Sequence, residues 1–96
     1  MRGIKLVAIF RVKKECVEEA KDVFEALIEP TRKEKGCIEY ELFQDTSDPA
    51  SFAFIEEWAT AEDLENHRKS EHLMSAREIM NYFTVEKISS TYSLVK

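Results

Sequence analysis

The stretch LENHRKSEHL, Leu64 to Leu73, contains both histidines of the chain, His67 and His72. An imidazole titrates near neutrality, so either residue could serve as a general base. A metal site is disfavoured, because residues five apart lie on different faces of a continuous helix and no cysteine or third histidine is near. A break at Ser70 would bring the histidines together, but two nitrogens are too few ligands. The competing structural interpretation is that each histidine caps a helix end or satisfies a backbone carbonyl.

Glu56 is the third residue whose type and position suggest chemistry. It lies in SFAFIEEW, on the same strand face as Phe54 and Trp58. Burial among aromatic rings raises the pKa of a carboxyl group, which would make Glu56 a proton carrier. The other interpretation is an ion pair with a basic residue of a neighbouring strand or subunit. Aromatic side chains that could line a pocket for a flat aromatic substrate are Tyr40, Phe52, Phe54, Trp58 and Tyr82, although core packing also explains them.

Length and composition limit the classes of protein to consider. The chain has 96 residues and 44% hydrophobic content, which predicts one domain, 1–96, with a single small core. It contains no run of the ~20 apolar residues that a membrane span needs, and its first apolar stretch is too charged for a secretory signal. Cys16 and Cys37 are expected at opposite ends of one helix, roughly 30 Å apart, so they cannot form a disulfide within one chain. Reduced thiols fit a cytoplasmic protein.

Hydrophobic periodicity predicts the elements that must position these residues. The predicted strands are 4–13, 37–45, 51–59 and 84–95, with a turn at 45–49. The first predicted helix, 17–35, is kinked by Pro30 and ended by Gly36. Two shorter helices follow, one capped by Thr60 and running through 64–68, the other capped by Ser70 and spanning 71–81. The order strand, helix, strand, strand, helix pair, strand is typical of an α+β, ferredoxin-like (βαββαβ) fold, with one antiparallel sheet and helices on one face.

The other face of this sheet is expected to be apolar and uncovered. The first strand has Val7 and Ile9 on that side, and the third has Ala53 and Ile55. A second copy of the chain, packed sheet against sheet about a two-fold axis, is the simplest way to bury such a face. The sequence therefore predicts a homodimer.

RNA-recognition motifs share this topology, and SFAFIEEW is similar to the aromatic strand on which they stack bases. The charge distribution argues against this function. Fourteen basic residues stand against 19 acidic ones, and between Gly36 and His67 there are nine Asp or Glu but no Lys or Arg. Because stacking without neutralisation of the phosphate backbone gives little affinity, we expect no nucleic-acid partner.

Three motifs together resemble the antibiotic biosynthesis monooxygenase family, in particular its small quinol monooxygenases. EKGCIEYELFQD contributes Glu34, Gly36, Cys37 and Tyr40, FIEEWAT contributes Glu56 and Trp58, and LENHRKSEHL contributes His67 and His72, all in family order. The resemblance covers nearly the whole chain. It implies a dimeric ferredoxin-like α+β barrel and, for many members, oxygen chemistry without flavin or metal. The resemblance thus implies no cofactor. Haem-degrading relatives share the fold, but the places of their haem-binding Asn, Trp and His are taken here by Ala8, His67 and Arg77, so haem degradation is not expected.

These observations predict a homodimeric monooxygenase that acts on a small electron-rich aromatic such as a hydroquinone. A base, His67 first and His72 second, would remove a phenolic proton, and the anion would pass an electron to O2. The protein would supply the base, a dry pocket and orientation. Two alternatives remain open: an enzyme that isomerises or degrades a small carbonyl compound with the same base, and a non-catalytic dimer that binds a small hydrophobic ligand.

Overall fold

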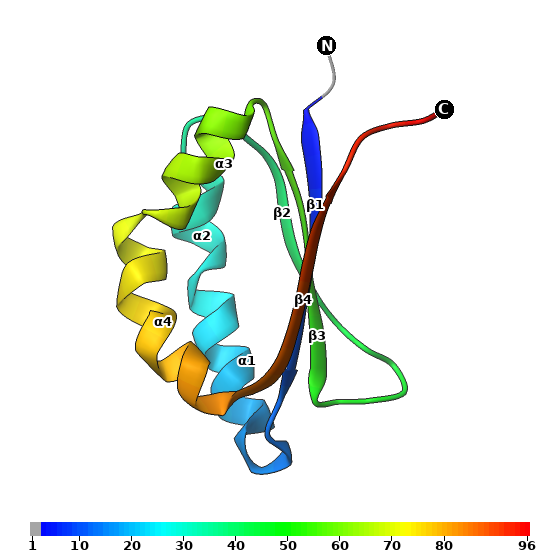
Figure 1. Cartoon of the computed structure of the whole chain (residues 1–96). Helices are drawn as coiled ribbons and strands as arrows, with labels where there is room; N and C mark the ends of the chain where they lie inside the picture. Colours follow the sequence, from blue (N-terminus) through cyan, green and yellow to red (C-terminus); the bar gives the residue numbers. More distant parts are fainter. Residues whose placement is uncertain (1–2) are drawn as a thin grey trace.

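The computed structural model describes residues 3–96 and has one four-stranded antiparallel sheet with all helices on one of its faces (Figure 1). The elements in chain order are β1 (Ile4–Val12), η1 (Lys14–Cys16), α1 (Val17–Ala26), α2 (Ile28–Arg32), β2 (Cys37–Gln44), β3 (Ser51–Trp58), α3 (Ala61–Arg68), α4 (Glu71–Phe83) and β4 (Thr84–Tyr92). The strand order is β2-β3-β1-β4. The predicted ferredoxin-like arrangement is confirmed. Helix α4 is longer than the predicted 71–81, and strand β4 is shorter than the predicted 84–95.

Alternation along the two central strands directs one set of side chains into the core. On β1 the even-numbered residues from Leu6 to Val12 are buried, and on β3 the even-numbered residues from Phe52 to Trp58 are buried. The ring of Phe24 on α1 fits against this surface, with ring centroids 5.2–5.4 Å from those of Phe10, Phe52, Phe54 and Phe83. Such aromatic pairs contribute about 0.5–1.5 kcal/mol each beyond their burial, so they fix helix α1 on the sheet.

The first helical region is interrupted near its proline, as expected. Pro30 has no N–H to donate to the carbonyl four residues earlier, at the end of α1. The helix accordingly ends at Ala26, and a separate five-residue helix, α2, follows Leu27. Gly36 then turns the chain into β2 with a φ of +80°, the left-handed conformation that the sequence predicted for it.

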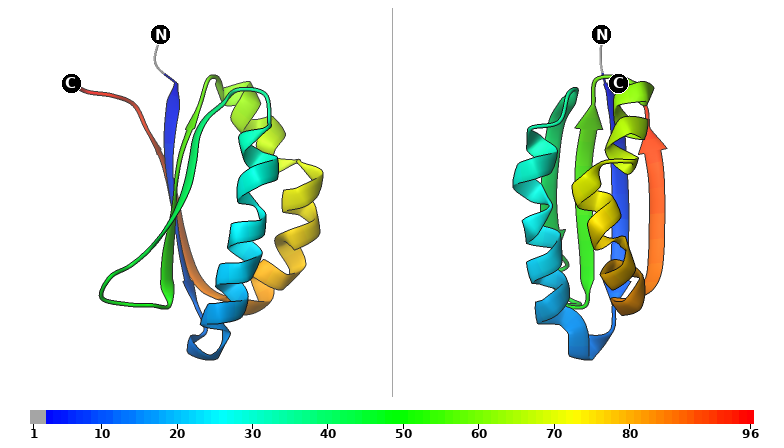
Figure 2. Two further views of the ribbon diagram at one scale, coloured as in Figure 1. Left: turned by 180° about the vertical axis from the view of Figure 1, so that it is seen from behind. Right: turned by 90° about the vertical axis from the view of Figure 1, so that its left-hand side faces the viewer.

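The second helical region is also broken, between α3 and α4 (Figure 2). The Thr60 hydroxyl accepts the backbone N–H of Asp63 at 3.0 Å, which confirms the predicted cap of α3. Helix α4 begins at Glu71, as expected, but the predicted Ser70 cap is wrong. The Ser70 hydroxyl oxygen is buried and has no hydrogen-bond partner among residues 3–96.

The face of the sheet opposite the helices is uncovered and apolar at its centre. Paired residues Phe43, Ala53, Ile9 and Ile88 form a row across all four strands. Ile9 is 38% exposed, and Phe43 and Ile88 are more than half exposed. Near one end of this face, Lys5 Nζ forms ion pairs with Glu39 at 2.6 Å and with Glu57 at 3.5 Å.

Cys16 and Cys37 are both free thiols. No helix in the described part of the chain is long and apolar enough to cross a membrane.

Candidate functional site

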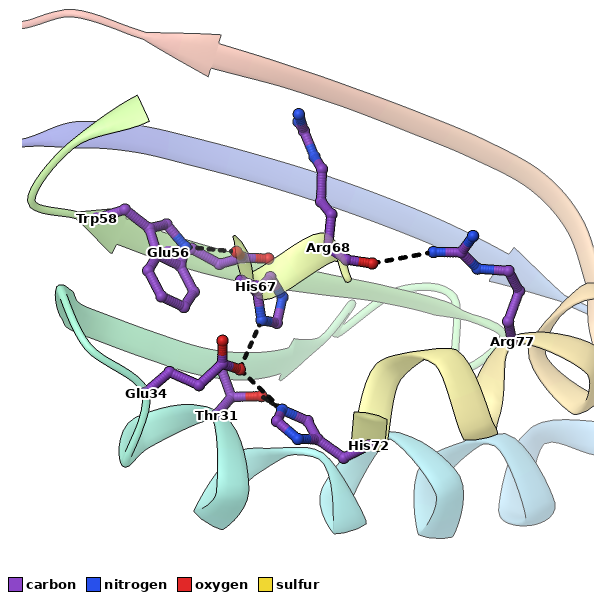
Figure 3. A network of polar contacts seen from close by, with 8 residues as sticks. All are labelled: Thr31, Glu34, Glu56, Trp58, His67, Arg68, His72 and Arg77. Carbon is purple, nitrogen blue, oxygen red and sulfur yellow. Dashed lines mark hydrogen bonds and ion pairs between the residues drawn. The ribbon is translucent and has the colours of Figure 1, made fainter. Parts of the chain in front are cut away.

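A partly buried carboxylate joins the two histidines. One oxygen of Glu34, Oε2, lies 2.9 Å from Nδ1 of His67 and 2.8 Å from Nε2 of His72 (Figure 3). The side chains are 17%, 5% and 24% exposed, respectively. Glu34, His67 and His72 are hereafter called the histidine–carboxylate cluster. The carboxylate is shared, so it fixes the orientation of both rings at once.

Local structure explains how residues 67 and 72 meet. The N–H groups of Lys69 and Ser70 bond to the carbonyls of Asn66 and His67 at 3.1 and 3.0 Å, which ends α3 and breaks the helix before α4. Helix α4 therefore starts in a new direction, and its first turn carries His72 back toward His67. The break at Ser70 that the sequence left open is present, so the expectation for a continuous helix does not apply.

The loop after α2 supplies the carboxylate. Glu34 lies two residues before Gly36, whose carbonyl accepts the N–H of Ala59 at 2.8 Å and ties the loop to the end of β3. Thr31 of α2 is fully buried, and its hydroxyl oxygen lies 3.1 Å from His72 Nε2. Thr31 thus contacts His72, which in turn contacts Glu34.

The hydrogen bonds assign the tautomer of His67. An ionised carboxylate only accepts hydrogen bonds, so Nδ1 of neutral His67 carries the proton and donates it to Glu34. Nε2 then keeps its lone pair and forms no hydrogen bond within residues 3–96. A positioned imidazole with a free lone pair and a carboxylate behind it is suited to act as a general base.

Two aromatic residues hold the ring of His67 in place. Trp58 stacks on it with ring centroids 4.7 Å apart and an interplanar angle of 28°, and Tyr40 contacts it edge-on at 5.4 Å. Burial raises the pKa of the Tyr40 hydroxyl, partly offset by a hydrogen bond from Thr31. Tyr40 is therefore a neutral phenol that forms part of the wall around the base.

His67 lines a pocket of about 290 Å³ between the helix pair α3–α4 and the sheet. Its lining combines apolar residues of the core with polar and charged ones: Leu6, Ala8, Phe10, Leu27, Tyr40, Phe54, Glu56, Leu64, His67, Arg68, Leu73, Arg77, Met80, Asn81, Thr84, Lys87 and Ser89. This volume is at the low end for small-molecule sites, about 300–1,000 Å³, so it is suited to a ligand of about one ring.

Glu56 is buried beside His67, and its surroundings match one of the two interpretations of the sequence. Burial raises the pKa of its carboxyl group, while the hydrogen bond from the Trp58 indole N–H, 2.9 Å long, partly offsets this shift. No ion pair to a basic side chain is formed by Glu56 within residues 3–96. Glu56 is thus an acid with a raised pKa in the wall of the pocket.

The structure brings some of the predicted site residues together and separates others. Tyr40, Phe54, Glu56 and His67 line the pocket, whereas His72 reaches it only through Glu34. Phe52 packs in the core against Phe24, and Trp58 lies behind His67 instead of facing the pocket.

Tyr82 lies outside the pocket. Its ring is 59% exposed on α4 and is covered by the ammonium group of Lys13 at 4.0 Å from its centroid. Tyr82 was named as an aromatic residue that could line a pocket, but the buried positions at this end of α4 are Met80 and Phe83.

Sequence reasoning missed Glu34 and Thr31 as site residues. Glu34 belongs to the EKGC motif on which the family resemblance rests, and that motif was the one signal for it. The third ligand also changes the argument about metals. The ligand atoms of Glu34, His67 and His72 all lie within 4.8 Å of one another, so the ligand count no longer excludes a metal ion there.

Comparisons with known proteins agree with this fold. The family model described as antibiotic biosynthesis monooxygenase matches residues 3–79. The crystal structure of PA3566 from Pseudomonas aeruginosa is 25% identical, with a TM-score of 0.95 over 100% of this chain and 97% of that one. A crystal structure titled antibiotic biosynthesis monooxygenase is 30% identical, with a TM-score of 0.92 over 97% and 99% of the two chains. The Synechocystis protein sll1783 is 37% identical over 59% of this chain, and the match spans only 39% of that longer protein.

Proposed function

The chain belongs to the antibiotic biosynthesis monooxygenase family, and from this premise we propose that it is a cofactor-independent monooxygenase of small electron-rich aromatics such as hydroquinones. The observation that carries the proposal is the pairing of Glu34 with Nδ1 of His67, which leaves Nε2 free as a base in the wall of the pocket. The small size of the pocket and the apolar residues in its lining favour a substrate of one ring.

In this proposal His67 starts the reaction by taking a phenolic proton on Nε2. The imidazolium that forms is stabilised by the carboxylate of Glu34, 2.9 Å from Nδ1. Stacking on Trp58 prevents the ring from turning away from the substrate. The product of this step is a phenolate, which is a far better one-electron donor than the phenol.

The phenolate then reacts with O2 without a further reagent. One electron passes to O2, the superoxide and the phenoxyl radical combine, and a new C–O bond forms at a ring carbon that bears hydrogen. The proton held by His67 goes to the peroxide. Loss of water breaks the O–O bond and leaves a hydroxyquinone, so hydroquinone and O2 give hydroxyquinone and water. Glu56, with its raised pKa, is placed to carry the second proton.

Oxygen uptake with a panel of quinols tests this proposal. We expect His67→Gln to lower kcat/KM by about 10²-fold or more, since general base catalysis typically contributes 10²–10⁴-fold. His72 contacts Glu34 but does not line the pocket, so His72→Gln should lower kcat/KM by a smaller factor. Equal turnover by the wild type and a folded His67→Gln variant would remove His67 from the mechanism.

The same assay separates the two alternatives. Substrate consumption that continues under nitrogen would indicate an isomerase or a degradative enzyme acting on a small carbonyl compound. Tight binding of quinols without consumption in either atmosphere would indicate a non-catalytic binding protein.

We also propose that two copies pack together through the uncovered faces of their sheets. The apolar row across the four strands supports this, because burying it would remove large exposed side chains from water. Ile9→Glu places a charge in the row and is expected to give monomers in sedimentation experiments. Met74→Glu, at a residue 52% exposed on α4, is the matched control and should remain dimeric. A monomeric wild type at micromolar concentration would contradict the proposal.

A further inference from the structure

The pocket has a polar wall on the edge strand β4. In the register of β1 with β4, Lys87 is opposite Phe10 and Ser89 is opposite Ala8. Phe10 and Ala8 point into the core, so Lys87 and Ser89 lie on the same side of the sheet as the helices. Both line the pocket, although β4 is almost entirely exposed to solvent. The pocket is thus apolar toward β1, lined by Phe54 and the acid Glu56 toward β3, and polar toward β4.

Three cations from three different elements surround this polar side. Arg68 ends α3, Arg77 lies on α4 and Lys87 lies on β4, and all three line the pocket. The acid that lines it is Glu56, whose raised pKa favours the neutral form. The concentration of positive charge is unusual in a chain with a net charge of −5.

The two arginines are held but retain free N–H groups. Arg77 donates from Nη2 to the backbone carbonyl of Arg68 at 3.3 Å (Figure 3). Arg68 forms an exposed ion pair with Glu65, in which Nη1 lies 3.2 Å from a carboxylate oxygen. A guanidinium group has five N–H donors in a fixed fork, so one bond leaves most of them available to an anion. In Figure 3 the side chain of Arg68 points away from Glu34, whereas that of His67 points toward it.

Thr84 supplies an independent indication of a ligand. It lines the pocket, and its hydroxyl oxygen is buried without a hydrogen-bond partner among residues 3–96. A buried polar atom without a partner is costly, by an amount comparable to a lost hydrogen bond. An oxygen-rich group of a bound molecule would satisfy the hydroxyl.

We propose that the substrate of this pocket carries an acidic group, a carboxylate or a phosphate, which Arg68, Arg77 and Lys87 bind while the ring lies against the apolar wall near His67. This inference rests on the proposed function for the site, and it names the class of substrate: a hydroxylated aromatic acid or aryl phosphate in preference to a neutral quinol. The same positive charge would also favour the phenolate that His67 produces.

Equilibrium binding under nitrogen tests the inference with defined probes. The probes are 2,5-dihydroxybenzoate, its neutral counterpart 2,5-dihydroxybenzamide, and 4-hydroxyphenyl phosphate with neutral hydroquinone. At low ionic strength we expect the more tightly bound of the two acidic probes to have a Kd at least about tenfold lower than that of its neutral counterpart. The preference should shrink as salt is added, because the three cations are exposed. Which acid shows the larger preference distinguishes a carboxylate site from a phosphate site.

Variants connect the preference to the named residues. The double variant Arg77→Gln, Lys87→Gln should reduce the ratio of the two dissociation constants to near one. Lys33→Gln, at an exposed lysine next to α2 and outside the pocket, is the matched control and should keep the wild-type ratio. Equal binding of acids and neutral probes by the wild type would overturn the inference, as would an undiminished ratio in the folded double variant.

The outcome is separable from that of the proposed function. Selective binding of an acid without oxygen uptake would support the anion site and reject the monooxygenase. Rapid oxygen uptake with neutral quinols, without any preference for acids, would support the monooxygenase and reject the anion site.

Discussion

The Glu34→Gln variant isolates the charge behind the proposed base. Both histidines contact the same oxygen of Glu34, at 2.9 and 2.8 Å. A glutamine carbonyl oxygen in that position can accept both hydrogen bonds, so the substitution removes the negative charge and keeps the donors satisfied. The folded state should therefore change little, whereas the imidazolium formed during proton transfer loses its counter-charge.

The size of the effect follows from the distance. Two unit charges 2.9 Å apart attract by about 1.4 kcal/mol at the dielectric constant of water and by about 6 kcal/mol at an effective value of 20. The side chains of His67 and Glu34 are 5% and 17% exposed, which places the pair between these limits. At 1.36 kcal/mol for each factor of ten, kcat/KM should fall by between about tenfold and about 10⁴-fold.

Steady-state oxygen uptake measures the predicted fall in kcat/KM, and urea unfolding tests whether the folded state is unchanged. The matched control is Glu29→Gln on α2, where the side chain is 77% exposed and the expected change in kcat/KM is negligible. A Glu34→Gln enzyme that unfolds like the wild type and turns over within about twofold of it would refute the idea that the carboxylate activates His67.

Three further predictions concern stability, pH and metals. Gly36→Ala should destabilise the fold by at least about 1–2 kcal/mol in urea unfolding, because φ is +80° and the new Cβ would overlap the carboxylate of Asp63. Adding Asp63→Ala to this variant should recover only the steric part of the loss. An unchanged unfolding midpoint for Gly36→Ala would contradict this account. Because the pKa of Glu56 is raised, the folded state keeps a proton that the unfolded chain releases above about pH 4.5. The free energy of unfolding of the wild type should therefore fall relative to that of Glu56→Gln as the pH rises from there. Parallel profiles of unfolding free energy against pH would show that burial of the acid is inconsequential. Dialysis against EDTA should leave oxygen uptake unchanged, and a loss restored by added metal would assign the histidine–carboxylate cluster to an ion.

Alternation made the sheet predictable from the sequence. A strand places every second residue on the same face, so the burial of Glu56 beside Phe54 and Trp58 could be foreseen from their spacing alone. The uncovered apolar face could be foreseen for the same reason. The helix breaks were signalled by Pro30 and by the polar residues around Ser70, because both interrupt regular hydrogen bonding.

The role of Glu34 could not be foreseen in this way. It lies between Lys33 and Lys35 just after a helix, a context typical of an exposed loop. Its partners are 33 and 38 residues further along the chain, and periodicity carries no information about such pairings. The tertiary structure alone shows that Gly36 and the break at Ser70 bring the three side chains together.

The strand order has a consequence for how the chain is made. Strand β1 is synthesised before the other three strands of this sheet, and in the folded sheet it lies between β3 and β4, the last of the four in sequence. Its second neighbour is therefore missing until translation has passed residue 92. The wall that carries Lys87 and Ser89 arrives only with that final segment, so a nascent or C-terminally shortened polypeptide can have its histidines in place and still have no closed pocket to offer a ligand.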